Sequence, residues 1–196
     1  MPDHSHFNIL QQGVEVWNSW RNQNPAVMPD LRQAYLLGEN LKGVNLSATD
    51  LAGAGMTECF LYKANLDNAN LAGAKLVHVD LCEANLAGAK LRGANLEEAN
   101  LLRSDLSDAD LSGALLTNAH MVGTNLERAT LTNCFVYGIS AWDLKLTGAH
   151  QQDLVITRYP DSAVTTDNIE VAQFIYLLLN NQKIRHVIDT LRSLAI

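Results

Sequence analysis

An apolar residue returns at every fifth position through most of the chain, and this period constrains the fold more than any other feature. From Leu31 to Leu146 all 24 positions at this spacing are apolar, and 20 of them are Leu. Neither a helix with 3.6 residues per turn nor a flat strand with a period of two repeats after five residues. The period therefore predicts a repeat architecture in which each five-residue unit is one structural step.

The other positions of the unit are similarly regular. At the position two residues before the apolar one, 13 of the 24 residues are Ala. At the position directly before it, 13 are Asn or Asp. Ten of the twelve Gly stand two residues after it. The apolar and the small residue alternate, so both side chains can face one side of a short extended segment. Gly and Asn supply the positive φ of a tight turn. We expect coils that stack through strand-type hydrogen bonds.

Units such as ANLDN, ANLAG, ANLEE and ADLSG resemble the A(N/D)LXX motif of the pentapeptide-repeat family. The resemblance covers residues 31–150 and implies a mainly β fold, a right-handed quadrilateral parallel β-helix with 20 residues per coil and about six coils. The expected organisation is an N-terminal capping helix and linker in residues 1–30, the β-helix in 31–150, and a C-terminal strand, loop and helical hairpin in 151–196.

The N-terminal segment predicts one amphipathic capping helix over residues 7–22, because Leu10, Val14 and Trp17 recur at helical spacing. A solenoid needs such caps, since open strand edges pair with other molecules.

The C-terminal tail predicts two helices. The segment DNIE predicts the start of a helix, with Asp167 as N-cap and Glu170 at the third helical position. This helix is expected to end near Asn180. A second apolar face follows, so a hairpin is expected that covers the last coil or forms a homodimer. The residues predicted to form this cap or dimer surface are Phe174, Ile175, Leu178, Ile184, Val187, Ile188 and Leu191.

Residues 20 apart should stack on one face, so the exterior can be interpreted as columns. One outward column is apolar, which is unusual for a surface. It consists of Tyr62, Cys82, Leu102, Val122 and Trp142, called the stripe below. Contiguous exposed apolar patches mark interfaces. Two interpretations of the stripe stay open, a binding site for another protein chain and a surface that the chain's own N- or C-terminal segment covers.

No residue pattern indicates chemistry. Cys59 and Cys134 occupy the small inward position, where free Cys substitutes for Ala. His78 is expected to stack between Glu58 and Glu98, an alternation of solvated charges, and the regular glycines form no phosphate-binding loop. We therefore expect a protein that is not an enzyme, with no catalytic residues, no cofactor and no metal.

Composition narrows the partners. A net charge of −7 argues against binding to phosphates of nucleic acid, and the chain contains no run of about 18 apolar residues that would span a membrane. The start of the chain is neither basic nor followed by a long apolar stretch, so we expect a cytoplasmic protein.

The leading functional hypothesis is a non-catalytic scaffold that mediates protein–protein interaction. The segment VAQFIYLLLNNQKIR looks like one that follows the repeats in some larger bacterial members of the family, which implies the repeat region or adaptor of a larger regulatory system. The alternative is a DNA mimic that binds a type II topoisomerase (gyrase), because some family members resemble duplex DNA in size and charge. Residues 31–150 contain 13 acidic and 9 basic side chains, which is a mild excess.

Overall fold

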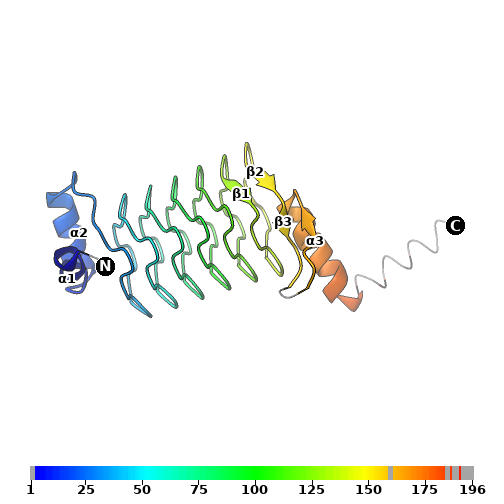
Figure 1. Ribbon diagram of the computed structural model, residues 1–196, viewed down its shortest axis with the longest axis horizontal. Coiled ribbons are helices and arrows are strands. Elements are labelled where there is room, and N and C mark those ends of the chain that lie inside the picture. The colour runs from blue at the N-terminus through cyan, green and yellow to red at the C-terminus, as the bar shows by residue number, and fades with distance from the viewer. Residues whose placement is uncertain (1–2, 159–160, 184–185, 187–189, 191–196) are drawn as a thin grey trace.

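The computed structural model describes residues 3–158, 161–183, 186 and 190. A row of stacked coils lies between two N-terminal helices, α1 (His4–Leu10) and α2 (Val14–Gln23), and the C-terminal helix α3 (Ile169–Asn180) (Figure 1). Short strands occur toward the C-terminal end, namely β1 (Thr130–Thr132), β2 (His150–Gln152), β3 (Leu154–Val155) and β4 (Thr165–Thr166). Along the rest of the row, the straight edges pair through single-residue bridges.

The bridges show how the coils stack. Each isolated bridge is parallel and joins residues 20 apart, as in Asn45 to Asn65, and four such columns run along the molecule. Strands β1 and β2 continue one column with the same register, Thr130 opposite His150. At the end of the row the pattern changes, because β3 pairs antiparallel with β4. Four pentapeptide units therefore make one coil.

The interior is filled by the two inward positions of each unit. The inward Leu side chains from Leu46 to Leu131 are almost completely buried, as are the Ala side chains at the small inward position. Buried hydroxyl groups in the small position are satisfied by backbone: Ser104 and Thr124 both donate to the Leu101 carbonyl oxygen, at 2.9 and 2.8 Å. Glu39 occupies the small position but is exposed.

Each turn places the residue two positions after the apolar one in the left-handed region. From Gln33 to Asp153 every fifth residue has a positive φ, between 51° and 73°. Gly tolerates this conformation at no steric cost, which explains its recurrence at this position. The other residues found there accept a modest strain.

The Asn and Asp before the apolar position tie down the turn that follows. At all 13 of these positions the side-chain oxygen accepts a hydrogen bond from the backbone N–H two residues later. Some amides also bond to the coil before, as when Asn65 Nδ2 donates to Asn45 Oδ1 at 3.3 Å. The column in which this pattern is most complete, called the Asn column below, is Asn45, Asn65, Asn85, Asp105 and Asn125.

The N-terminal segment forms two helices, so the prediction of one helix over residues 7–22 was wrong. Gly13, with φ of 104°, separates α1 from α2. A side chain other than Gly would be strained in that conformation. Helical spacing therefore continues across a point where the backbone changes direction.

Helix α2 satisfies polar groups of the first coil. Trp17 is fully buried and donates its indole N–H to the Asn45 carbonyl oxygen at 2.7 Å. Arg21 is also buried, and its guanidinium donates to the carbonyl oxygens of Val27 (2.7 Å) and Ser47 (2.9 Å). Because these groups would otherwise lie open at the end of the row, the contacts fasten the helix to it.

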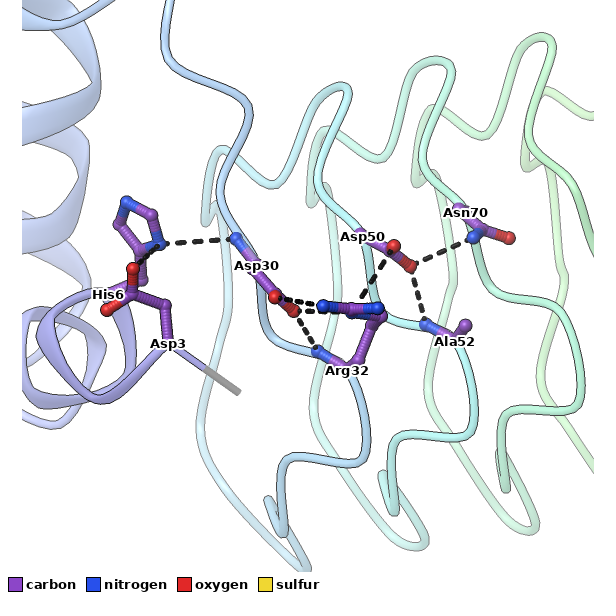
Figure 2. Close-up of polar contacts among 7 residues, drawn as sticks. All are labelled: Asp3, His6, Asp30, Arg32, Asp50, Ala52 and Asn70. Carbon is purple, nitrogen blue, oxygen red and sulfur yellow. Dashed lines mark hydrogen bonds and ion pairs between the residues drawn. The ribbon is translucent and has the colours of Figure 1, made fainter. Parts of the chain in front are cut away.

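A polar cluster joins α1 to the first coil (Figure 2). The backbone N–H of Asp30 donates to His6 Nδ1 at 3.2 Å, and the Asp3 N–H donates to the Asp30 carbonyl oxygen at 3.0 Å. The Arg32 guanidinium donates twice to the Asp30 carboxylate, at 2.6 and 3.0 Å, and lies 3.7 Å from Asp50. These hydrogen bonds to Arg32 lower the pKa of Asp30 to about 2.

Helix α3 begins one residue later than expected. Asn168 is the N-cap and its side chain accepts from the Val171 N–H at 2.9 Å, so the prediction that Asp167 caps the helix was wrong. Asp167 accepts instead from the Asp153 N–H at 2.8 Å, a contact between segments that sequence spacing does not reveal. The helix ends at Asn180, as predicted.

One side of α3 packs on the last coil. Ile169 and Ala172 are buried there. The Gln173 side chain is buried as well, and its Oε1 accepts from the Ala141 N–H at 2.6 Å. Tyr176 meets Tyr137 edge to face, with ring centroids 5.0 Å apart. Of the predicted second helix, Ile184, Val187, Ile188 and Leu191 lie outside the described residues.

Candidate protein-binding surface

The stripe lies on the outside of the coils, and each of its residues comes one position after the inward apolar residue of its unit. Tyr62, Cys82, Leu102 and Val122 are half-buried, whereas Trp142 is exposed by 56%. Successive coils are only about 4.8 Å apart, so neighbouring members of such a column shield one another. The stripe is therefore a continuous apolar ridge with its bulkiest side chain at the C-terminal end.

Aromatic side chains enlarge the N-terminal end of the stripe. Phe60 is exposed by 54% and lines a hollow of about 380 Å³ together with Tyr62, Lys42, Asn40 and Asp80. Phe60 was not among the residues predicted for this surface. The sequence does contain a signal for Phe60, because this large apolar residue stands at the outward position where the motif has Asn or Asp.

Two lysines surround the ring of Tyr62. Lys42 Nζ lies 4.9 Å and Lys63 Nζ 5.1 Å from the ring centroid, within the range of cation–π attraction. Lys63 also pairs with Glu83 at 3.3 Å. The Tyr62 hydroxyl and then Glu83 raise the pKa of Lys63, so its ammonium stays charged. This end of the stripe combines apolar area with positive charge.

At the other end, the stripe meets α3. Trp142 lines a cavity of about 230 Å³ together with Phe174 and Leu177. Of the predicted cap or dimer residues, Phe174 is exposed by 55%, and Ile175 and Leu178 are half-buried. Sequence analysis missed two further exposed residues of this helix, Val171 at 44% and Leu179 at 61%. The side of α3 that faces away from the coils is thus also apolar.

The cysteines at inward positions have a packing role. The thiols of Cys59 and Cys134 are buried and donate to the carbonyl oxygens of Leu36 (2.7 Å) and Leu111 (3.1 Å). Burial raises their pKa values, to about 11 for Cys59 and about 12 for Cys134. Because the thiolate is the reactive form, both side chains are poor nucleophiles.

Histidine and carboxylate side chains do not converge on one point in the part of the chain that the structure describes. There, no group of three or more His, Cys, Asp or Glu side chains is placed to hold a metal ion. His78 Nδ1 lies 3.4 Å from a carboxylate oxygen of Glu98. Among the same residues, no helix is long and apolar enough to cross a membrane.

Eight copies of the family model described as "Pentapeptide repeats" match residues 30–62, 64–103 and 104–138, which is more than half of the sequence. The chain belongs to the pentapeptide-repeat family, and its fold is the right-handed β-helix that the motif predicted. The comparison with curated protein sequences gave no significant match.

Solved structures of pentapeptide-repeat proteins are similar to this chain. One is Rfr23 from the cyanobacterium Cyanothece 51142, with 27% identity, coverage of 65% of this chain and 96% of that chain, and a TM-score of 0.46. Another is a protein from the thylakoid lumen of Arabidopsis thaliana, with 26% identity, coverage of 70% and 89%, and a TM-score of 0.45. A third, QnrB1, is a plasmid-mediated fluoroquinolone resistance protein with 13% identity, coverage of 61% and 81%, and a TM-score of 0.41.

Proposed function

We propose that this protein is a non-catalytic scaffold that binds another protein through the stripe. The observation that carries the proposal is the stripe itself, an apolar ridge across successive coils with aromatic residues at both ends, Phe60 and Tyr62 at one and Trp142 at the other. Aromatic side chains at the ends of a contiguous apolar surface are typical anchors of protein interfaces.

The rigidity of the coils supports this role. In the proposed architecture about six 20-residue coils stand between an N-terminal cap, α1 and α2, and a C-terminal cap, α3. Every coil is tied to its neighbours by parallel bridges along four columns. A surface built on such a frame loses little conformational entropy when a partner binds.

Capture from the native host, with a matched control, tests the proposal. Leu102→Glu combined with Val122→Glu places charge on the stripe, and Ala72→Glu places it at the equivalent position on another face. The doubly charged variant is expected to lose the partner that the wild type and Ala72→Glu both retain. Thermal unfolding of each variant shows whether the coils are intact. If the doubly charged variant captures the partner as well as the wild type does, the stripe is not the binding site.

A homodimer through α3 is a second form of the same proposal. Val171, Phe174 and Leu178 recur at helical spacing on the side away from the coils, and a helix that is apolar on two sides packs on both. Phe174→Glu is expected to convert a dimer into a monomer in sedimentation. A wild-type chain that sediments as a monomer at high concentration would contradict dimerisation.

The charge distribution favours the scaffold over the alternative of DNA mimicry. A mimic needs unpaired carboxylates along its surface, whereas Arg128 pairs with Asp108 at 2.7 Å and Lys63 with Glu83 at 3.3 Å. Other carboxylates accept backbone hydrogen bonds inside their own turns, as Asp105 does. DNA supercoiling by gyrase, measured with and without an excess of the protein, is expected to show no change. Inhibition or protection of gyrase would instead support the mimic.

A further inference from the structure

A groove lies on a different face from the stripe, at the C-terminal end of another bridge column. This column, called the open column below, consists of Tyr35, Gly55, Lys75, Asn95, Leu115 and Phe135. The groove has a volume of about 380 Å³, and its lining includes Leu115, Phe135 and Tyr137 from two neighbouring coils. Leu115 and Phe135 are bridge partners, so their side chains stack directly along the column. They form an apolar floor.

The open column has lost the hydrogen bonds that close the turns elsewhere. Asn95 retains the family pattern, since its side chain accepts from the Glu97 N–H at 3.0 Å. Leu115 and Phe135 cannot accept, and the N–H groups of Thr117 and Tyr137 have no hydrogen-bond partner among the described residues. Where the motif position is Asn or Asp, the equivalent N–H group donates to that outward side chain, so the N–H groups of Thr117 and Tyr137 also point outward. They are donors available to the carbonyl oxygens of a bound chain.

Opposite charges stand at the two ends of the groove. Glu97 lies at one end, and within the described part of the chain its carboxylate accepts only from the side-chain amide of Asn95, at 3.1 Å. Arg158 lies at the other end, with its guanidinium 4.9 Å from the ring centroid of Tyr137. Neither charged group has an ion-pair partner within the described ranges. This differs from much of the surface, where charges on neighbouring coils pair.

The walls of the groove are held in place before anything binds. Tyr137 is packed edge to face against Tyr176 of α3 and lies under the Arg158 guanidinium. Thr157 donates its hydroxyl to the Ser162 carbonyl oxygen at 3.1 Å. Fixed walls lower the entropy cost of binding, so a small groove can still be selective.

We propose that this groove binds an extended peptide segment of a partner protein, with a basic residue at Glu97, an apolar side chain on Leu115 and Phe135, and an acidic residue at Arg158. The two charges are two to three coil spacings apart, about 10 to 14 Å. An extended chain covers that length in three to four residues. Because successive side chains of an extended chain point to opposite faces, the basic, apolar and acidic residues of the segment stand at every second position, and the two charged residues are four positions apart.

Selection of short random peptides displayed on phage, using the full chain as bait, tests the proposal. The wild type is expected to enrich basic–apolar–acidic peptides. The charge-exchanged variant, Glu97→Lys with Arg158→Glu, is expected to enrich acidic–apolar–basic peptides at the same spacing. A synthetic peptide of the first kind should bind the wild type about tenfold more tightly than the charge-exchanged variant.

Two matched substitutions separate the groove from the stripe. Phe135→Asn removes the apolar floor but supplies the acceptor that the family motif has at this position, so folding is retained while enrichment is lost. Phe60→Asn makes the same change beside the stripe and is expected to leave the selected peptides unchanged. Three results would each overturn the proposal. These are selected peptides without a shared motif, the same motif with the charge-exchanged variant, and equal loss of peptide enrichment in both Asn variants. Because the stripe lies on another face, failure of its proposed role would leave these results unaffected.

Discussion

The Asn column and the open column are built on the same backbone and differ in what their outward side chains do. In the Asn column every member accepts the N–H of the turn that follows, and amides such as Asn65 also donate to the coil before. In the open column only Asn95 does so, and the other members are aromatic, aliphatic, basic or Gly. The same motif position thus serves folding on one face and is free for recognition on another.

The comparison predicts that core substitutions lower the free energy of unfolding by the same amount beneath both columns. Leu86→Ala lies beneath the Asn column and Leu96→Ala beneath the open column, and both side chains are fully buried. Each is expected to lower the free energy of unfolding by about 3 kcal/mol, because each leaves a cavity of similar size. Chemical denaturation measures both values. A large difference between them would mean that the faces also differ inside.

Exchanging the outward residues should have opposite effects on the two columns. Asn85→Leu removes the hydrogen bond from the Ala87 N–H (3.0 Å) and the bond to Asn65 (3.3 Å), so it is expected to destabilise by about 1–2 kcal/mol. Leu115→Asn supplies an acceptor to an unpaired N–H and is expected to cost nothing or to stabilise slightly. Denaturation midpoints of the two variants test this. Equal destabilisation in both would remove the distinction between the columns.

At the N-terminal end, Asp30 at the Asn/Asp position forms an additional ion pair with Arg32, and the contribution of this pair to the free energy of unfolding depends on pH. Asp30 has its pKa lowered to about 2 by Arg32, below the value of an unfolded chain. Its ionised form therefore stabilises the fold above about pH 4, and this contribution is lost as the pH falls toward 2. Asp30→Asn is expected to cost up to about 1 kcal/mol at pH 7, because solvent screens the pair, and almost nothing at pH 2. Unfolding curves at both pH values measure this, and a difference that grows on acidification would contradict it.

The turn position should respond to backbone conformation alone. Ala48 has φ of 51°, a left-handed conformation that favours Gly. Ala48→Gly is expected to be neutral or to stabilise by up to about 0.5 kcal/mol, because relief of strain offsets the greater freedom of the unfolded chain. Ala72→Gly, one residue earlier in its unit, removes no such strain and is expected to destabilise by about 0.5 kcal/mol. Thermal unfolding of the pair gives the comparison, and the reverse order would exclude strain as the cause.

Much of the fold could be predicted from the sequence because the interactions that shape each unit lie within its own five residues. The inward Leu and Ala, the Asn or Asp acceptor and the Gly corner all act within five residues, and the 20-residue register follows from the family motif. The two helical ends were harder to predict. Helical spacing runs through Gly13 although the helix does not, and Asp167 has the spacing of a cap although Asn168 fills that role.

The candidate surfaces were only partly predictable. The stripe followed from counting in steps of 20, and Phe60 could have been found in the same way. The groove could not, because it requires Glu97 and Arg158 to lie at two ends of one hollow, and Arg158 reaches it only through the contact with Tyr137. That contact depends on how the chain leaves the last coil and how α3 packs there.

The repeating coil, its aliphatic interior and the faces on which the motif is broken follow from the order of the amino acids alone. These depend on interactions between residues that are neighbours in the chain or a constant number of positions apart. The folded molecule was needed to show where the helices lie against the two ends, which carbonyl groups Trp17 and Arg21 reach, and which charges of the described residues remain unpaired. The physical reason is that these contacts join segments with no common period, so their geometry depends on the shape of the surface that the folded coils present.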